Sequence, residues 1–88
     1  MTYTKVVGSD SVKTSSAQQD IGLYKPENET YPVTFKKFQF MNYKDCTVSI
    51  NNGERIFLPA NCGMDLEMKI KSFVINESGV DFIWVGGY

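Results

Sequence analysis

Few side chains in this chain of 88 residues could carry out catalysis. Histidine, the commonest general base, is absent, so the Ser-His and Cys-His pairs that activate nucleophiles cannot be built. Asp65 and Glu67 lie two residues apart and would share one face of a strand, like the carboxylate pair that glycoside hydrolysis requires. That face would also carry Lys69 and Lys71, and alternating charges are typical of a solvent-exposed face. The sequence therefore predicts no catalytic residue and no enzyme.

Ligands for a metal or a cofactor are equally sparse. A structural zinc site uses four cysteine or histidine ligands, and Cys46 and Cys62 are the only two such residues here. The glycines of the second half fall at predicted turns or near the chain end, so none opens a phosphate-binding helix. We expect neither a metal nor a cofactor. The two cysteines either form a disulfide or stay reduced as small semi-buried side chains, and the sequence leaves both alternatives open.

Aromatic side chains are the remaining candidates for recognition. Exposed rings on a sheet can stack on sugars or on single-stranded nucleic acid. Nucleic acid and anionic membranes also attract surplus positive charge, whereas this chain has nine basic and ten acidic residues and a formal charge of −1. We therefore expect no nucleic acid and no membrane partner, and we assign most rings to the core. The rings predicted to contact a protein partner are Tyr31, Tyr43, Trp84 and Tyr88.

The length and composition allow one domain. A hydrophobic content of 42% in 88 residues is enough for a single compact core. The first eight residues lack the apolar run of a signal peptide, and no segment reaches the length of a membrane span. The chain is accordingly expected to be made and kept in the cytoplasm until it joins a larger assembly.

The composition changes near residue 31, which suggests an extended N-terminal arm (residues 1–30) before a compact body (residues 31–88). Residues 8–29 are mostly polar and show no sustained periodicity. Such an arm is either disordered or becomes ordered along a neighbouring subunit, and both alternatives stay open. Its candidate partner-binding residues are Ile21, Leu23 and Tyr24. Residues 3–7 are prone to form a strand that adds to a sheet edge, and the body is expected to fold without residues 1–29.

The body has the pattern of short strands separated by turns. Residues 33–40 alternate between apolar and polar with a slip at 36–37, and residues 46–50 and 55–58 flank an Asn-Asn-Gly turn. Residues 64–71 alternate again, and residues 72–75 and 80–85 flank a further turn. The predicted fold is all-β, a small antiparallel β-sandwich or barrel.

The last strand differs from the others because both of its faces are apolar. Val80, Phe82 and Trp84 share one face, and Ile83 and Val85 share the other. A strand that is apolar on both faces belongs in the middle of a sandwich or at a subunit interface.

Residues 40–42, 46–53, 56–61 and 70–80 resemble small structural proteins of tailed bacteriophages. In those proteins a short β-sandwich packs into a ring, a trimer or a spike base, often with an extended N-terminal arm. The resemblance spans residues 33–88. It rests on the general pattern of residue types along these segments and includes no diagnostic motif. It implies a virion component such as a head decoration, head fibre, connector or baseplate element, which would bind other virion proteins and form homo-oligomers. It carries over no catalytic residue.

Two other functions are alternatives to assembly. One is a module that binds a carbohydrate or a receptor through exposed tyrosine and tryptophan rings and asparagines of the turns. The other is a small enzyme or an inhibitor of a host protein, which no residue pattern supports.

Overall fold

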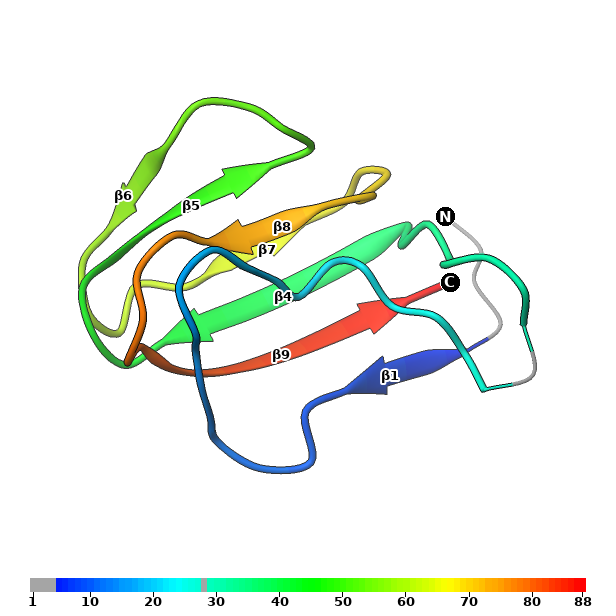
Figure 1. The fold of residues 1–88 in the computed structure, drawn as a ribbon, viewed down its shortest axis with the longest axis horizontal. Coiled ribbons are helices and arrows are strands. Elements are labelled where there is room, and N and C mark those ends of the chain that lie inside the picture. The colour runs from blue at the N-terminus through cyan, green and yellow to red at the C-terminus, as the bar shows by residue number, and fades with distance from the viewer. Residues whose placement is uncertain (1–4, 28) are drawn as a thin grey trace.

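The computed structural model describes residues 5–27 and 29–88, and the regular structure in this part of the chain is β-strand (Figure 1). The strands are β1 (Val6–Gly8), β2 (Lys13–Thr14), β3 (Gln19–Asp20), β4 (Lys37–Asn42), β5 (Cys46–Ile50), β6 (Ile56–Leu58), β7 (Met64–Leu66), β8 (Phe73–Ile75) and β9 (Asp81–Gly87). Among these residues there is no helix that could cross a membrane.

In the described residues the strands form two antiparallel sheets that pack against each other (Figure 1). Sheet A has the order β1-β9-β4-β7, and β2 also pairs with β9. Sheet B has the order β3-β8-β5-β6. This arrangement confirms the predicted all-β, antiparallel sandwich.

The core fills the space between the two sheets. Alternate residues of the longer strands point inward, so the fully buried side chains come from both layers. Rings dominate this core, and they include Phe35, Phe38, Phe40, Phe73 and Phe82. Gly86 lies against the Phe35 ring, and a Cβ atom there would be only 2.6 Å from that ring. A larger residue at position 86 would therefore push the two layers apart.

The predicted hairpin between residues 46–50 and 55–58 is present as β5 and β6. Asn51 and Asn52 have φ angles of 51° and 61°, and the Gly53 N–H donates to the Ile50 carbonyl at 2.9 Å. Positive φ at both central residues, with this hydrogen bond, is the geometry of a type I′ turn. The positive angles of the predicted Asn-Asn-Gly turn therefore fall on the two asparagines and not on Gly53.

The segment predicted to be an arm lies on the body. β1 and β2 pair with β9, and β3 pairs with β8, so this segment contributes to both sheets. Ile21 is only 7% exposed and belongs to the core. Residues on both sides of position 30 thus share the same sheets and the same core, so the structure shows no division there. Of the strand predicted at residues 3–7, Tyr3 and Thr4 lie outside the described residues, and β1 joins the edge of the chain's own sheet.

The outer face of sheet B carries the polar residues Thr47 and Ser49 together with their cross-strand partners Phe57 and Val74. Asn76 Nδ2 donates to Thr47 Oγ1 at 3.2 Å and to Ser49 Oγ at 3.4 Å. The Glu77 carboxylate accepts the Thr47 backbone N–H and the Thr47 hydroxyl, both at 2.7 Å. Burial by itself would raise the pKa of Glu77, but the hydrogen bonds from Thr47 outweigh it and lower the pKa below 4.5.

We expect Glu77 to make the fold sensitive to acid. Because its pKa is lower in the folded chain, its stabilisation is complete above pH 4.5 and is lost as the pH falls through the folded pKa. Glu77→Gln should lower the free energy of unfolding by about 1 kcal/mol at neutral pH, and should reduce its fall in acid. Urea unfolding above and below pH 4.5 tests this, with the exposed Glu54→Gln as control. Equal acid dependence of wild type and Glu77→Gln would contradict the assignment.

Candidate functional site

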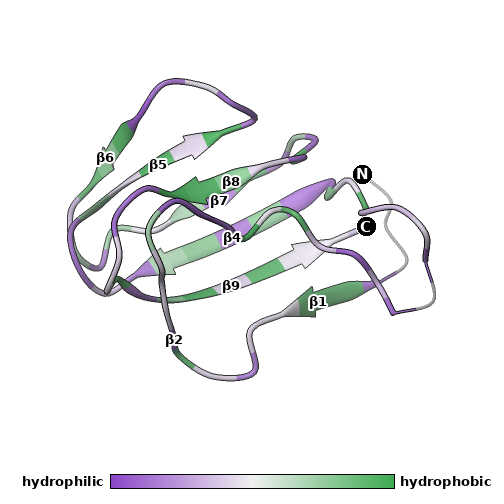
Figure 2. Cartoon of the chain, in the orientation of Figure 1, coloured by the Kyte–Doolittle hydropathy of each residue, from purple (hydrophilic) through white to green (hydrophobic). Residues whose placement is uncertain are grey.

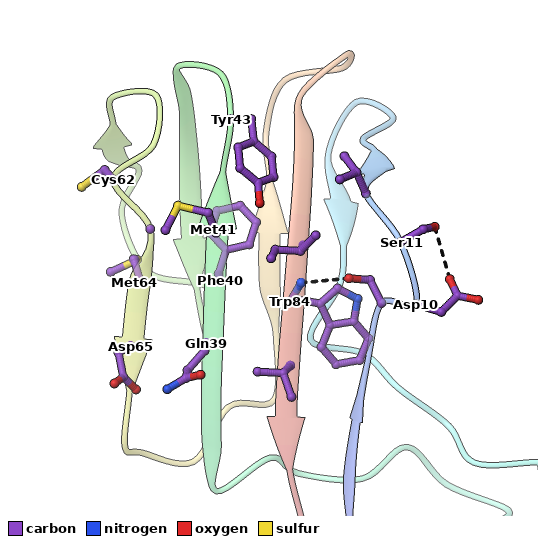
Figure 3. A pocket seen from close by; sticks show the side chains of 15 residues that line it. Asp10, Ser11, Gln39, Phe40, Met41, Tyr43, Cys62, Met64, Asp65 and Trp84 are labelled. Atoms are coloured by element: carbon purple, nitrogen blue, oxygen red, sulfur yellow. Dashed lines mark hydrogen bonds between the residues drawn. The ribbon is translucent and has the colours of Figure 1, made fainter.

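A groove with a volume of about 800 Å³ lies on the outer face of sheet A, away from the core (Figure 3). Its floor is formed by Gln39 and Met41 of β4 and by Ile83 and Val85 of β9. These residues point outward because the alternate residues of the same strands, such as Phe40 and Phe82, point into the core. We call this hollow the sheet A groove.

One rim of the sheet A groove is the connection between β1 and β2, residues 9–12. Ser9 holds this rim against β9, because its hydroxyl accepts the Trp84 N–H at 3.1 Å and its N–H donates to the Trp84 carbonyl at 3.0 Å (Figure 3). Asp10 forms an ion pair with Lys13 at 2.9 Å. The hydrogen bond from Lys13 and its positive charge lower the pKa of the exposed Asp10 carboxyl.

The opposite rim consists of Tyr43 and residues 62–65, and a buried asparagine positions it. Asn42 Nδ2 donates to the carbonyl oxygens of Lys44 at 2.9 Å, Leu58 at 3.2 Å and Pro59 at 2.9 Å. Asn42 Oδ1 accepts the Gly63 N–H at 2.9 Å. One side chain of β4 therefore holds both ends of the loop that leads from β6 to β7.

A smaller hollow of about 230 Å³ continues the sheet A groove along the sheet, sharing Gln39 and Val85 with it. Lys37 lies in this extension and forms ion pairs with Glu67 at 3.0 Å and Asp65 at 3.5 Å. The hydrogen bond to Glu67 raises the pKa of Lys37, and burial opposes that rise. The charged side chains at the edges of the groove thus form ion pairs with each other.

The residues of the sheet A groove are suited to contact with another surface. Its floor is apolar except for Gln39, and the acidic groups Asp10 and Asp65 lie on the rims beside lysines. The described residues contain no group of three or more histidine, cysteine, aspartate or glutamate side chains that could hold a metal. An apolar floor with a polar rim is the usual anatomy of a protein interface.

Both cysteines are free thiols in this structure. Cys46 is buried, and its burial, followed by the nearby Glu77 and Asp45 carboxylates, raises its pKa to about 11. It is therefore a protonated, inert thiol at neutral pH. Cys62 is exposed on the groove rim, whereas the reduced alternative for the two cysteines predicted semi-buried thiols.

Two of the residues predicted to contact a partner border the sheet A groove. Tyr43 is 41% exposed and stands on its rim. Trp84 also borders the groove, but its ring stacks on Phe38 on the inner side, with centroids 5.5 Å apart and planes at 17°. The Trp84 ring thus serves mainly as part of the core.

The other predicted partner residues lie elsewhere. Tyr24 and Tyr88 are half-buried with ring centroids 6.3 Å apart, and Ile21 lies in the core. Leu23 and Tyr31 are exposed by 59% and 78%, away from the groove. The side chain of Ile21 is therefore turned toward its own chain and away from any partner.

The floor of the groove contains residues that the sequence did not single out as a site. No sequence pattern indicated that Met41 or Gln39 would belong to a site. Ile83 and Val85 did carry one, because they form the second apolar face of the last strand. That apolar face is now seen to be the floor of the sheet A groove.

Comparison with known proteins adds no relative. No protein family, no curated protein and no solved structure matches this chain. The functional conclusion below therefore rests on the residues of the groove and on the sequence.

Proposed function

We propose that this chain is a non-enzymatic assembly protein that joins other protein surfaces through the sheet A groove. The observation that carries the proposal is the apolar floor of this groove on the outer face of sheet A. Met41, Ile83 and Val85 form that floor, where the outer face of an antiparallel sheet commonly carries polar residues. The outer face of sheet B is mixed, because Thr47 and Ser49 share it with their cross-strand partners Phe57 and Val74.

The exposed fractions support a contact role for this face. Ile83 is 37% exposed in the floor, and Tyr43 and Val12 on the rims are 41% and 56% exposed. These side chains, with Met41 and Val85, give the groove a contiguous apolar surface. Covering it with another protein surface would remove these side chains from water, at about 25 cal/mol for each Å² of apolar area.

The larger assembly that we propose is the virion of a tailed bacteriophage. This part of the proposal is supported by the resemblance of residues 33–88 to small phage structural proteins. The chain would be made in the host cytoplasm and would become a head decoration, head fibre, connector or baseplate element. Its partners would be other virion structural proteins and further copies of itself.

The carbohydrate-binding alternative has less support. It relied on exposed rings of Trp84 and Tyr43, and the Trp84 ring is packed against Phe38. Tyr43 alone remains as an exposed ring on the groove rim. Sugar sites usually stack a pyranose on an aromatic face and surround it with hydrogen-bonding groups, and this floor offers only Gln39.

The proposal is tested by locating the chain in purified particles. We expect wild-type protein to co-purify with virions in a density gradient, and Ile83→Lys to remain in the soluble lysate because a charge would be buried on assembly. Phe57→Lys is the matched control, since Phe57 is 61% exposed on β6 and no residue of β6 lines the groove. Figure 2 shows β6 as a hydrophobic strand. Wild-type protein absent from particles would contradict the virion function. Equal incorporation of Ile83→Lys and wild type would contradict the role of the groove.

A further inference from the structure

We propose that Asn52 is a site of self-modification, at which the side chain loses its amide and the residue becomes aspartate or isoaspartate. The site lies in the turn that joins β5 to β6, at the edge of sheet B (Figure 1). None of the turn residues 51–53 lines the sheet A groove. The inference therefore goes beyond the proposed function and does not depend on it.

The reaction needs only the asparagine side chain, the next backbone nitrogen and water. The Gly53 nitrogen attacks Cγ of Asn52 and gives up its proton to water, the Cγ–Nδ2 bond breaks, and ammonia leaves a cyclic succinimide behind. Water then opens the ring. Cleavage of the new N–Cγ bond gives aspartate, and cleavage of the original peptide bond gives isoaspartate, whose backbone runs through Cβ and Cγ. The reaction uses no oxidant and no reductant.

Gly53 makes this position the reactive one. A side chain on the residue after an asparagine hinders the approach of its nitrogen to Cγ, and glycine has no side chain. The hairpin itself favours glycine here, because a Cβ atom on Gly53 would lie 2.9 Å from the Ile50 carbonyl oxygen. The residue that closes the hairpin thus also supplies an unhindered nitrogen.

The two adjacent asparagines of the turn differ in the freedom of their side chains. Asn51 Nδ2 donates to the Lys69 carbonyl at 2.9 Å, and Asn51 Oδ1 accepts the N–H groups of Lys71 at 2.8 Å and Ser72 at 3.2 Å. These bonds hold the Asn51 side chain in place. Asn52 is exposed, and its side chain has no hydrogen bond to any residue that the structure describes. Its carboxamide is therefore free to turn toward the nitrogen of the next residue.

One hydrogen bond opposes the reaction in the folded chain. The Gly53 N–H donates to the Ile50 carbonyl at 2.9 Å, and this bond must break before the nitrogen can attack. The adjoining strand β6 has three residues and stands at the end of the strand order of sheet B. A short edge strand opens locally without unfolding of the whole domain. We therefore expect Asn52 to react in the folded protein, more slowly than in an unfolded chain.

The isoaspartate product would damage the hairpin. It lengthens the backbone of a turn whose two central residues both need positive φ angles. The register of Thr47 with Phe57 and of Val48 with Ile56 depends on that turn. The aspartate product keeps the backbone unchanged and adds only an exposed negative charge.

Peptide mapping of the full folded chain by mass spectrometry, after long incubation at mildly alkaline pH, tests the proposal. We expect residue 52 to show the mass shift of an amino group replaced by a hydroxyl group. Fragmentation that separates isoaspartate from aspartate should find both products. Asn51 in the same chain should keep its amide over the same time, because its side chain is held by hydrogen bonds.

Asn61 is the matched control for the effect of the next residue. It is exposed, it has a φ angle of 63°, and the N–H that follows it donates to the Pro59 carbonyl at 3.2 Å, much as the Gly53 N–H does in its own turn. The residue after Asn61 is Cys62, whose side chain hinders the attack. We expect conversion of Asn52 to be complete before conversion of Asn61 is detected.

Retention of the amide at residue 52 in the folded chain, under conditions that convert it in a free peptide of residues 46–58, would overturn the inference. Conversion of Asn51 or Asn61 as fast as that of Asn52 would also overturn it. The purified isoaspartate form should unfold at a lower temperature than the Asn52→Asp variant. Equal unfolding temperatures would contradict the damage to the hairpin.

Discussion

Removal of residues 1–22 is expected to unfold the chain and not to release a folded body. The deletion takes away β1 and β2 from the edge of sheet A and β3 from sheet B. It also removes Ile21 from the core, and it removes the Asp20 carboxylate that accepts the Phe73 N–H at 2.9 Å. A core of this size leaves a net stability of only a few kcal/mol, which these losses exceed. This result is the opposite of what the polar composition of the segment suggested.

Circular dichroism and thermal unfolding of the truncated chain measure this effect. A matched pair of substitutions in the full chain separates burial from composition. Ile21→Ala should lower the free energy of unfolding by about 2–5 kcal/mol, since Ile21 is 7% exposed. Leu23→Ala should change it by less than about 0.5 kcal/mol, since Leu23 is 59% exposed. A truncated chain that keeps a cooperative β-sheet transition would restore the interpretation of residues 1–30 as a dispensable arm.

Asn42→Asp is expected to be the most damaging change among those that keep the shape of the side chain. Asn42 is fully buried, and its Nδ2 donates to the carbonyl oxygens of Lys44, Leu58 and Pro59. A carboxylate cannot donate, so it would place a buried negative charge against those three oxygens. We expect a loss of about 3 kcal/mol or more in the free energy of unfolding, together with loosening of the loop that forms the groove rim.

Urea unfolding at several pH values checks this prediction. Acidification should restore part of the stability of Asn42→Asp, because a protonated carboxyl is neutral and can donate one hydrogen bond. Asn52→Asp is the control, since Asn52 lies exposed in the hairpin turn and aspartate tolerates its positive φ of 61°. Similar losses for both variants would show that the three hydrogen bonds donated by Asn42 Nδ2 contribute little to stability.

The strands predicted from local sequence patterns are present in the segments where alternation and turn residues are both clear. Alternation and turn residues are properties of neighbours in the sequence, so they locate β5, β6 and β8 well. The alternation of residues 64–71 overestimates its strand, because β7 ends at Leu66 and Met68 is 44% exposed. Only Ile70 returns to the core, through a bridge to Phe35.

The role of the N-terminal segment could not be predicted, because its stability comes from partners far away in the sequence. Lys13 and Thr14 look like linker residues until they pair with Phe82 and Asp81 of β9. The groove has the same origin, because its rims come from residues 9–12 and 62–65 on either side of β9 and β4. A single sequence shows that Ile83 and Val85 form an apolar face, but it does not show what surrounds that face.

The pairing of β1 with the end of β9 has a consequence for the order in which the chain folds. The Lys5 N–H donates to the Tyr88 carbonyl and the Tyr88 N–H to the Lys5 carbonyl, both at 2.9 Å. The strand β1 therefore cannot form its pair until the last described residues, in and after β9, are present. Sheet A cannot close until β9 is in place, and contacts between segments so far apart in the sequence form slowly. We therefore expect closure of sheet A to be a late step of folding.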